Sequence, residues 1–510
     1  MRNPLTRALV VLAVTAVAVT SCAGQPQPQA ASPPPAWEAC GAGLDCATVQ
    51  VPVDPAQPEG RSVGIALVRH RATDPARRLG VLLYNPGGPG APTTEFIQTL
   101  GVSRIASDAV AARYDVVGMD PRGVGRSEPV RCLSDAEREQ NLAADLDPTL
   151  SGGLPQPEVV AAARTLAQGC AAGVAPDLLG HLSTDVVAAD IDRVRAALGE
   201  ERISFFGQSY GTLLGATYAT LFPQRVDRMV LDAPVDPARW RADPLGATVE
   251  QALGGEELLD LWFASCTAAG PACPFGAGDP AAAFDALVVA LERNPITVAP
   301  TGPAPGGRLD GAGVLIAART AVFDRMLWPV LTAGLVAAQR GDGALLLALA
   351  TAPNRTPDGS PSGLVEANAA VNCLDRAVPT DLGAHDRNAA EIKAKVHRFG
   401  SISGYLLLPC AFWPVHGSAA APPTAAGAPP ILVIGGRSDS QTPYPWAVTM
   451  AAGIPSATLL TREGVGHGSY RSSGPCIDQR VDAYLLSAAL PDPGATCQQE
   501  PPASAALPPH

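Results

Sequence analysis

A serine inside a glycine-flanked pentapeptide is the first sign of chemistry in this sequence. Ser209 is the central residue of G-Q-S-Y-G (207–211), which matches the pattern G-x-S-x-G. The pentapeptide follows a short apolar run at 203–206 and precedes an apolar, helix-like segment at 212–222. Glycines on both sides allow a serine to occupy a strained turn between a strand and a helix, where its hydroxyl is exposed. We therefore predict that Ser209 is a nucleophile; the alternative is an ordinary serine in a glycine-rich turn.

A serine hydroxyl becomes a good nucleophile only when a base removes its proton and an acid orients that base. Where the serine lies in such a strand-to-helix turn, the acid and then the histidine follow it along the chain. Among the seven histidines, His467 lies in a loop of small residues, G-V-G-H-G-S (464–469), downstream of an apolar run at 431–434. Small neighbours would let the imidazole approach the serine, so we predict that His467 is the base.

Asp439 is the predicted acid of this group. It follows the apolar run 431–434 and precedes His467. The carboxyl ends of the strands in an α/β sheet are where catalytic groups are presented. Asp232 and Asp236, which follow another apolar run, remain alternatives, either as the acid or as residues that cap a turn.

The oxyanion that forms when a serine attacks a carbonyl needs two backbone N–H donors. One should be the amide of Tyr210, directly after the nucleophile. The other should come from the loop N-P-G-G-P-G (85–90), where Gly87 or Gly88 lets the backbone approach a substrate. That loop is not a phosphate-binding loop, because the lysine and the Ser/Thr of that motif are absent. The G-V-G at 123–125 lacks the third glycine of a dinucleotide fingerprint.

Short apolar runs that are stopped by glycine or proline predict buried strands that could position these residues. Five such runs lie at 81–84, 115–119, 203–206, 228–231 and 431–434. A helical pattern such as 183–198 lies between them, and alternating strands and helices indicate a parallel α/β sheet. The alternation breaks between residues 238 and 425, where the chain is alanine-rich and helical in pattern. We expect a helical domain inserted between the fourth and fifth of these strands.

The beginning of the chain predicts export from the cytoplasm. Residues 1–21 combine two arginines with an apolar run that is too short to span a bilayer, which is typical of a secretory signal. The run ends in V-T-S-C, which resembles a bacterial lipobox, and residues 22–36 are a proline-rich tether. We therefore expect an extracytoplasmic protein anchored to the cell membrane by a lipid on Cys22. The alternative is ordinary cleavage and secretion.

The cysteines fit that oxidising location. Of the eleven cysteines, all but Cys22 are expected to form disulfides, which persist outside the cytoplasm. We predict pairing between neighbours in the sequence: Cys40–Cys46, Cys132–Cys170, Cys266–Cys273, Cys373–Cys410 and Cys476–Cys497. None of the cysteines and histidines has zinc-binding spacing, so a metal is not expected. No organic cofactor is implied either. A net charge of −12 argues against a nucleic-acid partner.

Taken together, several motifs resemble the secreted tripeptidyl-aminopeptidase-like α/β-hydrolases of actinobacteria, which are relatives of the prolyl iminopeptidases. The motifs are N-P-G-G-P-G (85–90), D-P-R-G-V-G-R-S (120–127), G-Q-S-Y-G (207–211), L-D-A-P-V-D-P (231–237), D-S-Q-T-P (439–443) and G-V-G-H-G (464–468). The resemblance extends over about residues 40–500. It implies an α/β-hydrolase fold in which residues 37–237 and 426–510 form the core and residues 238–425 form a helical lid.

The resemblance also implies a function. It places the nucleophile on Ser209, the acid on Asp439 and the base on His467, with Gly88 and Tyr210 as the oxyanion donors. The expected activity is that of a serine exopeptidase that releases amino acids or short peptides, such as tripeptides, from peptide N-termini. A carboxylesterase or lipase with the same triad remains an alternative, since a triad does not choose between amide and ester. A surface binding lipoprotein without catalysis is the other alternative.

An aminopeptidase must also hold the free amine of its substrate, which calls for carboxylates beside the cleft. The resemblance places them in the lid, where the candidates are Glu250, Glu256, Glu257, Glu366 and Asp375. We favour Asp375, with Glu366 as a second residue. Peptides are the expected partners, and the lipid anchor is the only expected membrane contact. The sequence leaves the oligomeric state open, with a monomer favoured.

Overall fold

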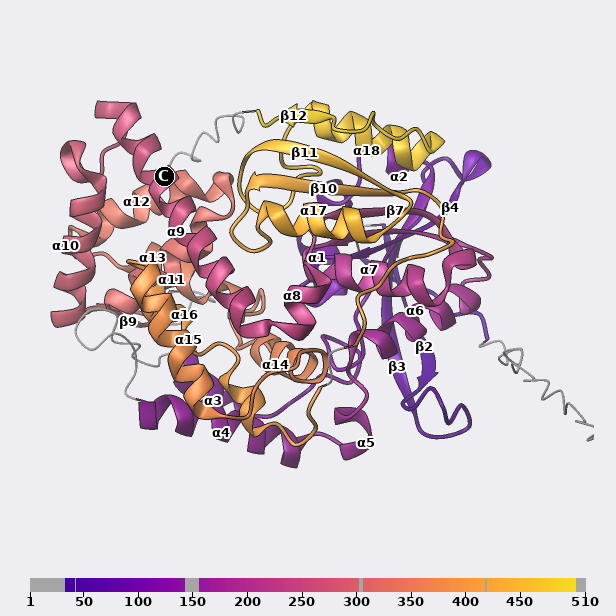
Figure 1. Ribbon diagram of the computed structural model, residues 1–510, viewed down its shortest axis with the longest axis horizontal. Helices are drawn as coiled ribbons and strands as arrows, with labels where there is room; N and C mark the ends of the chain where they lie inside the picture. Colours follow the sequence, from indigo (N-terminus) through magenta and orange to yellow (C-terminus); the bar gives the residue numbers. More distant parts are fainter. Residues whose placement is uncertain (1–32, 42, 143–155, 302–305, 418–419, 501–510) are drawn as a thin grey trace, which may run out of the picture. The chain divides into compact units, whose positions relative to one another are not determined.

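The computed structural model describes residues 33–41, 43–142, 156–301, 306–417 and 420–500. The predicted signal at 1–21 and Cys22 lie outside these described residues. The strands of the main sheet are β1 (Glu38–Gly41), β2 (Leu44–Pro52), β3 (Ser62–His70), β4 (Gly80–Asn85), β5 (Tyr114–Met119), β6 (Ile203–Gln208), β7 (Val226–Asp232), β10 (Ile431–Ser438), β11 (Ala457–Val465) and β12 (Thr496–Gln498). Figure 1 shows the central strands running side by side.

The main sheet is mostly parallel, with an antiparallel edge at its N-terminal end. The strand order is β1-β2-β3-β5-β4-β6-β7-β10-β11-β12. β1, β2, β3 and β5 pair antiparallel, whereas all pairs from β5 through β4 to β12 are parallel. The five apolar runs predicted as strands are β5, β4, β6, β7 and β10, which are consecutive neighbours in the sheet. Their side chains are almost entirely buried, which explains why continuous apolar runs mark them.

Helices cover both faces of the sheet. One face packs against α4 (Gln156–Gly173), α6 (Thr184–Ala197), α7 (Tyr210–Leu221) and α17 (Tyr444–Gly453). The other face packs against α1 (Thr93–Leu100), α2 (Asp108–Ala111) and α18 (Pro475–Ser487). Two further short helices, α3 (Asp135–Leu142) and α5 (Pro176–Leu179), lie between β5 and β6 in the sequence. This three-layer arrangement confirms the predicted α/β-hydrolase fold class.

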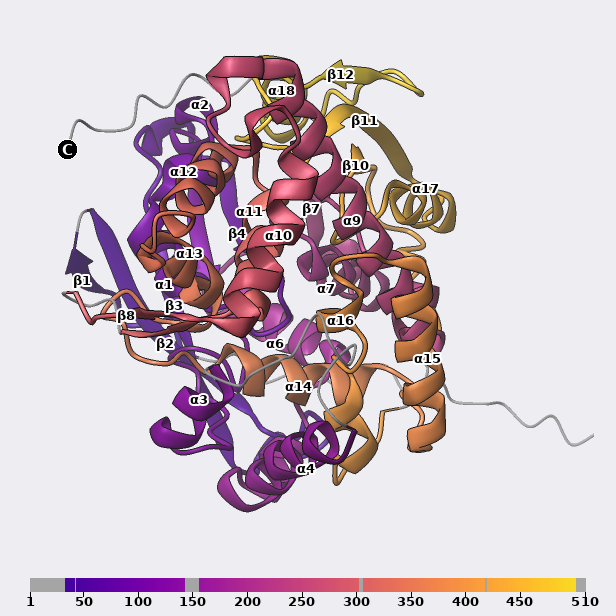
Figure 2. The same ribbon diagram turned by 90° about the vertical axis from the view of Figure 1, so that its left-hand side faces the viewer.

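The segment between β7 and β10 is helical, as its composition predicts. Its helices are α8 (Pro237–Ala242), α9 (Pro244–Ala269), α10 (Pro280–Arg293), α11 (Gly311–Val322), α12 (Trp328–Ala338), α13 (Ala344–Thr351), α14 (Leu364–Asp375), α15 (Leu382–Lys395) and α16 (Gly400–Ser403). The strands β8 (Ile296–Val298) and β9 (Gly307–Leu309) pair antiparallel beside them. Figure 1 shows α10 to α13 gathered to one side of the main sheet, and in Figure 2, which is seen from that side, these helices stand in front of it.

Most of this insertion has a hydrophobic cluster of its own. The cluster includes Leu258, Trp262, Phe284, Leu315 and Leu331, all of them buried. α14 is different, because Ala369, Ala370 and Val371 belong to the cluster that packs against the sheet. The insertion is therefore joined to the sheet through α14, and also through Trp240 of α8 and Ala247 of α9, which belong to the same cluster, while α10 to α13 pack mainly on one another.

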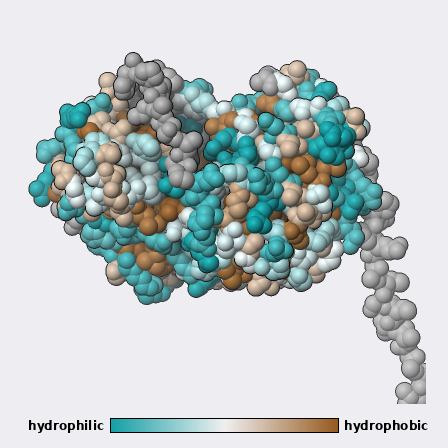
Figure 3. All heavy atoms as spheres, turned by 90° about the horizontal axis from the view of Figure 1, so that it is seen from above, coloured by the Kyte–Doolittle hydropathy of each residue, from teal (hydrophilic) through white to brown (hydrophobic). Residues whose placement is uncertain are grey.

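Five disulfides are present among the described residues, at the predicted pairs Cys40–Cys46, Cys132–Cys170, Cys266–Cys273, Cys373–Cys410 and Cys476–Cys497. The pairing of sequence neighbours is thus confirmed. In the same part of the chain, none of the helices combines the length and the apolar character needed to cross a bilayer. On the face seen in Figure 3, apolar and polar side chains are interspersed.

Candidate active site

Ser209 occupies a strained turn between β6 and α7. Its backbone has φ 58° and ψ −128°, a left-handed conformation that non-glycine residues rarely adopt. The Ser209 N–H donates to the Asp232 carbonyl oxygen (3.0 Å), which fixes the turn to the end of β7. This geometry is that of a nucleophile elbow, in which the serine side chain projects beyond the strand ends.

The glycine loop at 85–90 passes directly over this turn. A side-chain Cβ added at Gly87, whose φ is +100°, would lie 2.8 Å from the Ser209 Cβ and 3.0 Å from the Tyr210 nitrogen. Only glycine allows so close an approach. The glycine loop therefore approaches the amide of Tyr210 at Gly87, as an oxyanion site requires. The assignment of Gly88 and Tyr210 as the two donors stays a prediction.

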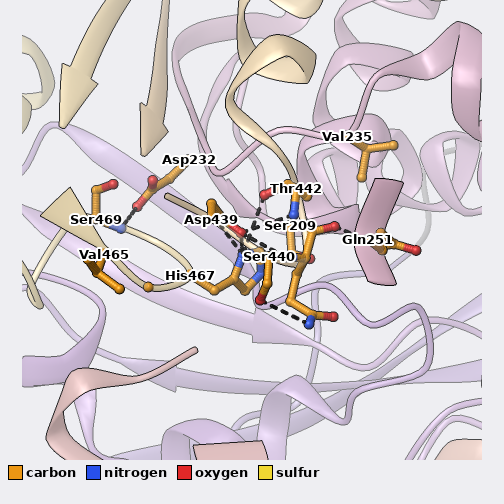
Figure 4. Close-up of polar contacts among 12 residues, drawn as sticks. Ser209, Asp232, Val235, Gln251, Asp439, Ser440, Thr442, Val465, His467 and Ser469 are labelled. Atoms are coloured by element: carbon orange, nitrogen blue, oxygen red, sulfur yellow. Dashed lines mark hydrogen bonds and ion pairs between the residues drawn. The ribbon is translucent and has the colours of Figure 1, made fainter. Parts of the chain in front are cut away.

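Asp439 and His467 form a direct pair. The two carboxylate oxygens of Asp439 lie 2.9 and 3.0 Å from the His467 Nδ1. One of these oxygens also accepts the N–H groups of Gln441 (2.9 Å) and Thr442 (3.0 Å), which holds the carboxylate in place. The side chain of Asp439 is 0% exposed, against 14% for His467. Figure 4 shows Ser209 beside this pair.

The electrostatics of the pair suit a triad. Burial alone would raise the pKa of the Asp439 carboxyl, but the imidazole of His467 and the Thr442 N–H outweigh it and hold that pKa below its ordinary value. An ionised Asp439 favours the imidazole tautomer that carries its proton on Nδ1. The Nε2 of His467 is then free to accept a proton from a serine hydroxyl.

Asp232, the alternative acid, has a different role in the structure. Its Oδ2 accepts the N–H groups of Ser469 (2.8 Å) and Tyr470 (2.9 Å), two and three residues after the histidine. Figure 4 shows the contact with Ser469. Burial raises the pKa of Asp232, although these two N–H groups oppose the rise. Because its backbone carbonyl holds Ser209, Asp232 links the serine turn to the histidine loop. Asp236 caps α8 by accepting the N–H groups of Ala238 and Arg239.

The histidine loop is held by three further groups. A Cβ added at Gly468 would lie 1.9 Å from the Gln208 Nε2, so the loop packs directly on the residue before the nucleophile. The His467 N–H donates to the Phe323 carbonyl oxygen of the insertion (2.7 Å). The buried guanidinium of Arg462 donates to the carbonyl oxygens of Val465 (2.7 Å) and Gly466. No spacing in the sequence pointed to Phe323 or Arg462.

Helix α9 of the insertion lies against the loop that carries the acid. The Gln251 Nε2 donates to the Gln441 carbonyl oxygen (2.7 Å), and the Ser438 hydroxyl donates to Glu257 (3.0 Å). A Cβ added at Gly254 would lie 2.9 Å from the Ser440 Cα. The insertion therefore contacts both the acid loop, through α9, and the histidine loop, through Phe323.

The five lid carboxylates proposed for amine binding all have partners within the chain. Both oxygens of Asp375 accept from Thr184, one from its N–H (2.8 Å) and one from its hydroxyl, and burial raises the pKa of Asp375 to about 6. Glu366 is buried and accepts from the Arg138 Nε (2.7 Å). The other three accept from Trp446, from the backbone at 398–399 and from Ser438. The role of Asp375 and Glu366 in amine binding stays a prediction.

The buried Asp375 also connects to the serine turn. The Thr184 hydroxyl that meets its carboxylate lies 2.5 Å from the Tyr210 hydroxyl. The side chain of Tyr210 is thus anchored to the start of α6 and the end of α14, while its amide faces the glycine loop. Among the described residues, no group of three or more His, Cys, Asp or Glu side chains is arranged so that it could hold a metal ion.

Comparison with known proteins places this geometry in a family. Residues 80–263 match the family described as alpha/beta hydrolase fold, and residues 395–497 match the one described as TAP-like protein. Serine protease Hip1 of Mycobacterium tuberculosis (strain ATCC 25618 / H37Rv) is 35% identical over 473 residues, covering 89% of this chain and 87% of that protein. The tripeptidyl aminopeptidase of Streptomyces lividans is 32% identical over 481 residues, covering 90% and 86%.

A third relative carries a different name. Carboxylesterase B of Mycobacterium tuberculosis (strain ATCC 25618 / H37Rv) is 34% identical over 468 residues, covering 89% of this chain and 86% of that protein. All three relatives match nearly the full length of the chain, including the insertion. The chain therefore belongs to the α/β-hydrolase family, among its TAP-like proteins, and is a serine hydrolase.

Proposed function

We propose that this protein is an extracytoplasmic serine exopeptidase that releases amino acids or short peptides, such as tripeptides, from peptide N-termini. The observation that carries the proposal is the strained Ser209 turn beside the Asp439–His467 pair. The names of two relatives, a serine protease and a tripeptidyl aminopeptidase, support peptide bonds as the target.

The proposed reaction runs through an acyl-enzyme. The Nε2 of His467 takes the proton from the Ser209 hydroxyl as the serine oxygen attacks the scissile carbonyl. The amides of Gly88 and Tyr210 hold the oxyanion, and the leaving amine takes the proton from His467 as the C–N bond breaks. A water molecule then gives its proton to His467 and attacks the acyl group, which releases the acid product and returns the proton to Ser209.

We also propose that residues 238–425 act as a lid over this triad. Helix α9 contacts the acid loop and Phe323 contacts the histidine loop, so movement of the insertion would reach both. A lid of this kind would admit a peptide end and exclude the middle of a folded chain. That selection is consistent with the removal of residues from a terminus.

The proposed location rests on the sequence and on the disulfides. Five disulfides are typical of an oxidising compartment, and the lipobox-like segment supports a lipid on Cys22. The full-length protein should therefore partition with the cell membrane, and a Cys22→Ala variant should be recovered in the soluble or secreted fraction. Membrane recovery of Cys22→Ala equal to that of the wild type would contradict the anchor.

Carboxylester hydrolysis is the second candidate, because one relative is named carboxylesterase B. Three substrate types separate the candidates: tripeptidyl-arylamides with a free N-terminus, the same arylamides with an acetylated N-terminus, and p-nitrophenyl acyl esters. An exopeptidase hydrolyses the first and loses most of that activity when the amine is blocked. Turnover of esters alone would favour the esterase. No turnover of any substrate, and no change in Ser209→Ala, would favour a non-catalytic lipoprotein.

A further inference from the structure

A pocket of about 80 Å³ lies beside His467, between the main sheet and the insertion. From the core, it is lined by Arg104, Gln208, Arg462 and the histidine loop; from the insertion, it is lined by the segment 323–326. A volume of this size holds several water molecules and is therefore large enough for a carboxylate group.

The charge of the pocket is predominantly positive. Four guanidinium groups line it, those of Arg104, Arg325, Arg462 and Arg471, against the two carboxylates of Asp324 and Glu500. Such an excess of guanidinium groups in a partly enclosed pocket favours an anionic ligand.

Two of these guanidinium groups already have partners. Arg462 donates to the carbonyl oxygens of Val465 and Gly466, and Arg471 pairs with Asp478 (2.6 Å). They contribute positive charge, but their hydrogen-bonding capacity is largely used within the chain.

The other two are open to a ligand. Among the described residues, neither the guanidinium of Arg104 nor that of Arg325 makes a hydrogen bond or an ion pair with another group of the chain. The guanidinium of Arg325 lies 5.6 Å from the centre of the Trp328 ring, which can steady it without using its donors. Asp324, its neighbour, accepts the Met326 N–H (2.9 Å) and caps the short helix η6 (Arg325–Leu327).

The position of the pocket indicates which part of a substrate would reach it. In the proposed reaction His467 protonates the leaving amine, so the leaving peptide must lie next to this imidazole. His467, Gly466 and Gly468 line the pocket themselves, and the Phe323 carbonyl that holds the His467 N–H belongs to its wall. A group on the first residue after the scissile bond would therefore be the part nearest to the pocket.

We propose that Arg104 and Arg325 form a subsite for a carboxylate on the leaving peptide. The carboxylate is either the C-terminal carboxylate of a short peptide or an acidic side chain on the first residue after the scissile bond. This inference rests on the proposed peptidase function and adds a substrate class to it. Guanidinium groups recognise carboxylates through paired, charge-assisted hydrogen bonds. Arg104 lies on η2 (Val102–Arg104) of the core, and Arg325 lies on the insertion. A carboxylate bound by both arginines would therefore bridge the core and the insertion.

Two pairs of peptides that share one acyl portion test the subsite in the full-length enzyme. In the first pair the leaving residue is alanine with a free carboxylate or with an amide cap. In the second pair it is amide-capped aspartate or amide-capped asparagine. The expected result is a preference of about tenfold in kcat/KM for the charged member of at least one pair, the size expected of one charge-assisted contact. The pair that responds identifies the source of the carboxylate.

Substitution of the two arginines tests whether they cause the preference for the charged peptide. In Arg104→Gln/Arg325→Gln the ratio of charged to neutral substrate should fall to about one, because the donors for the carboxylate are gone. Arg340→Gln is the matched control, since Arg340 is an exposed arginine at the end of α12 that does not line the pocket. The control should keep the wild-type ratio, and thermal unfolding should confirm that all variants are folded.

The outcomes separate this inference from the proposed function. Equal rates on charged and neutral peptides, or a preference that survives in the double variant, would overturn the subsite while leaving the peptidase intact. Failure of the wild-type enzyme to cleave any peptide, with ester hydrolysis retained, would overturn the peptidase and the subsite together.

Discussion

Two buried carboxylates, Asp439 and Asp232, end neighbouring strands of the sheet and have different partners. Asp439 faces the imidazole of His467, whereas Asp232 accepts two backbone N–H groups and holds Ser209 through its carbonyl. The sequence favoured Asp439 on position alone. It could not reveal what Asp232 does, because the N–H groups that it binds lie more than two hundred residues away and reach it only through the fold.

Substitution of each carboxylate should separate catalysis from positioning. Asp439→Asn should lower kcat by a factor on the order of 10³–10⁴, because the imidazole loses the partner that sets its tautomer. Asp232→Asn should instead lower the free energy of unfolding by about 1–3 kcal/mol, since the two backbone N–H groups that share Oδ2 lose their charged acceptor. Steady-state kinetics and urea unfolding measure the two effects. A stable Asp232→Asn variant that is as inactive as Asp439→Asn would contradict these roles.

Asp375 gives the protein a pH dependence of stability. Its pKa is raised by burial to about 6, above the value of about 3.9 expected in the unfolded chain. Between these values the folded protein keeps a proton that the unfolded chain releases, so stability falls as the pH rises from about 4 to about 6. The accumulated loss above pH 6 is about 2–3 kcal/mol.

An Asp375→Asn variant removes this titration. It should therefore unfold at higher urea concentration than the wild type at pH 7, and its stability should change less between pH 4 and pH 6. Asn can still accept the Thr184 N–H, which limits the structural cost. A variant that is less stable than the wild type at pH 7 would show that the ionised carboxylate is stabilising instead.

At the scale of elements, the strands that carry the site could be predicted and the strands at the edges could not. β4, β6, β7 and β10 are buried on both faces, so they appear as continuous apolar runs. β11, with the sequence A-T-L-L-T-R-E-G-V, is half-exposed at both ends and has no such run. The antiparallel strands β1 and β2 were missed for a similar reason, because β2 alternates between exposed and buried positions.

The contacts of the insertion with the site also lay beyond prediction. Alanine-rich composition indicates helices, but it does not say which helix faces the acid loop. The close packing of α9 depends on Gly254, where an added Cβ would lie 2.9 Å from the Ser440 backbone. An isolated glycine inside a helical pattern is a weak sign of such packing, and only the structure identifies its neighbour.

Gly254→Ala tests whether α9 positions the acid loop. The added methyl group should displace Ser440 and with it Asp439, lowering kcat/KM by about tenfold or more. Gly453→Ala is the matched control, because a Cβ there would meet no atom within 4 Å. Kinetics on one arylamide substrate compare the two variants. Equal activity of both variants would mean that the acid loop tolerates movement of α9.

At the scale of the whole molecule, disulfides link separate helices and strands whose cysteines lie in or against the hydrophobic clusters. Cys373–Cys410 connects α14 to the short helix η8 (Leu408–Phe412), and Cys476–Cys497 connects α18 to the terminal strand β12. The sequence predicted the pairing because each cysteine bonds to its neighbour along the chain. The predicted leader and lipid anchor lie outside the described residues and stay predictions.

Removal of one such link should destabilise the molecule without changing its chemistry. The double variant Cys373→Ala/Cys410→Ala should lose about 2–4 kcal/mol of unfolding free energy, the usual contribution of a disulfide that closes a loop of this length. Urea unfolding under oxidising conditions measures the loss. If the wild type under reducing conditions were as stable as under oxidising conditions, the disulfides would have no stabilising role.

The central claim is that Ser209 is a nucleophile activated by His467 and Asp439. Covalent labelling with a fluorophosphonate, followed by mass spectrometry of the digested protein, tests it most directly. The expected result is a single adduct, on Ser209, that is absent from Ser209→Ala and forms much more slowly in His467→Ala. No adduct on the folded protein, or an adduct on another residue that persists in Ser209→Ala, would contradict it.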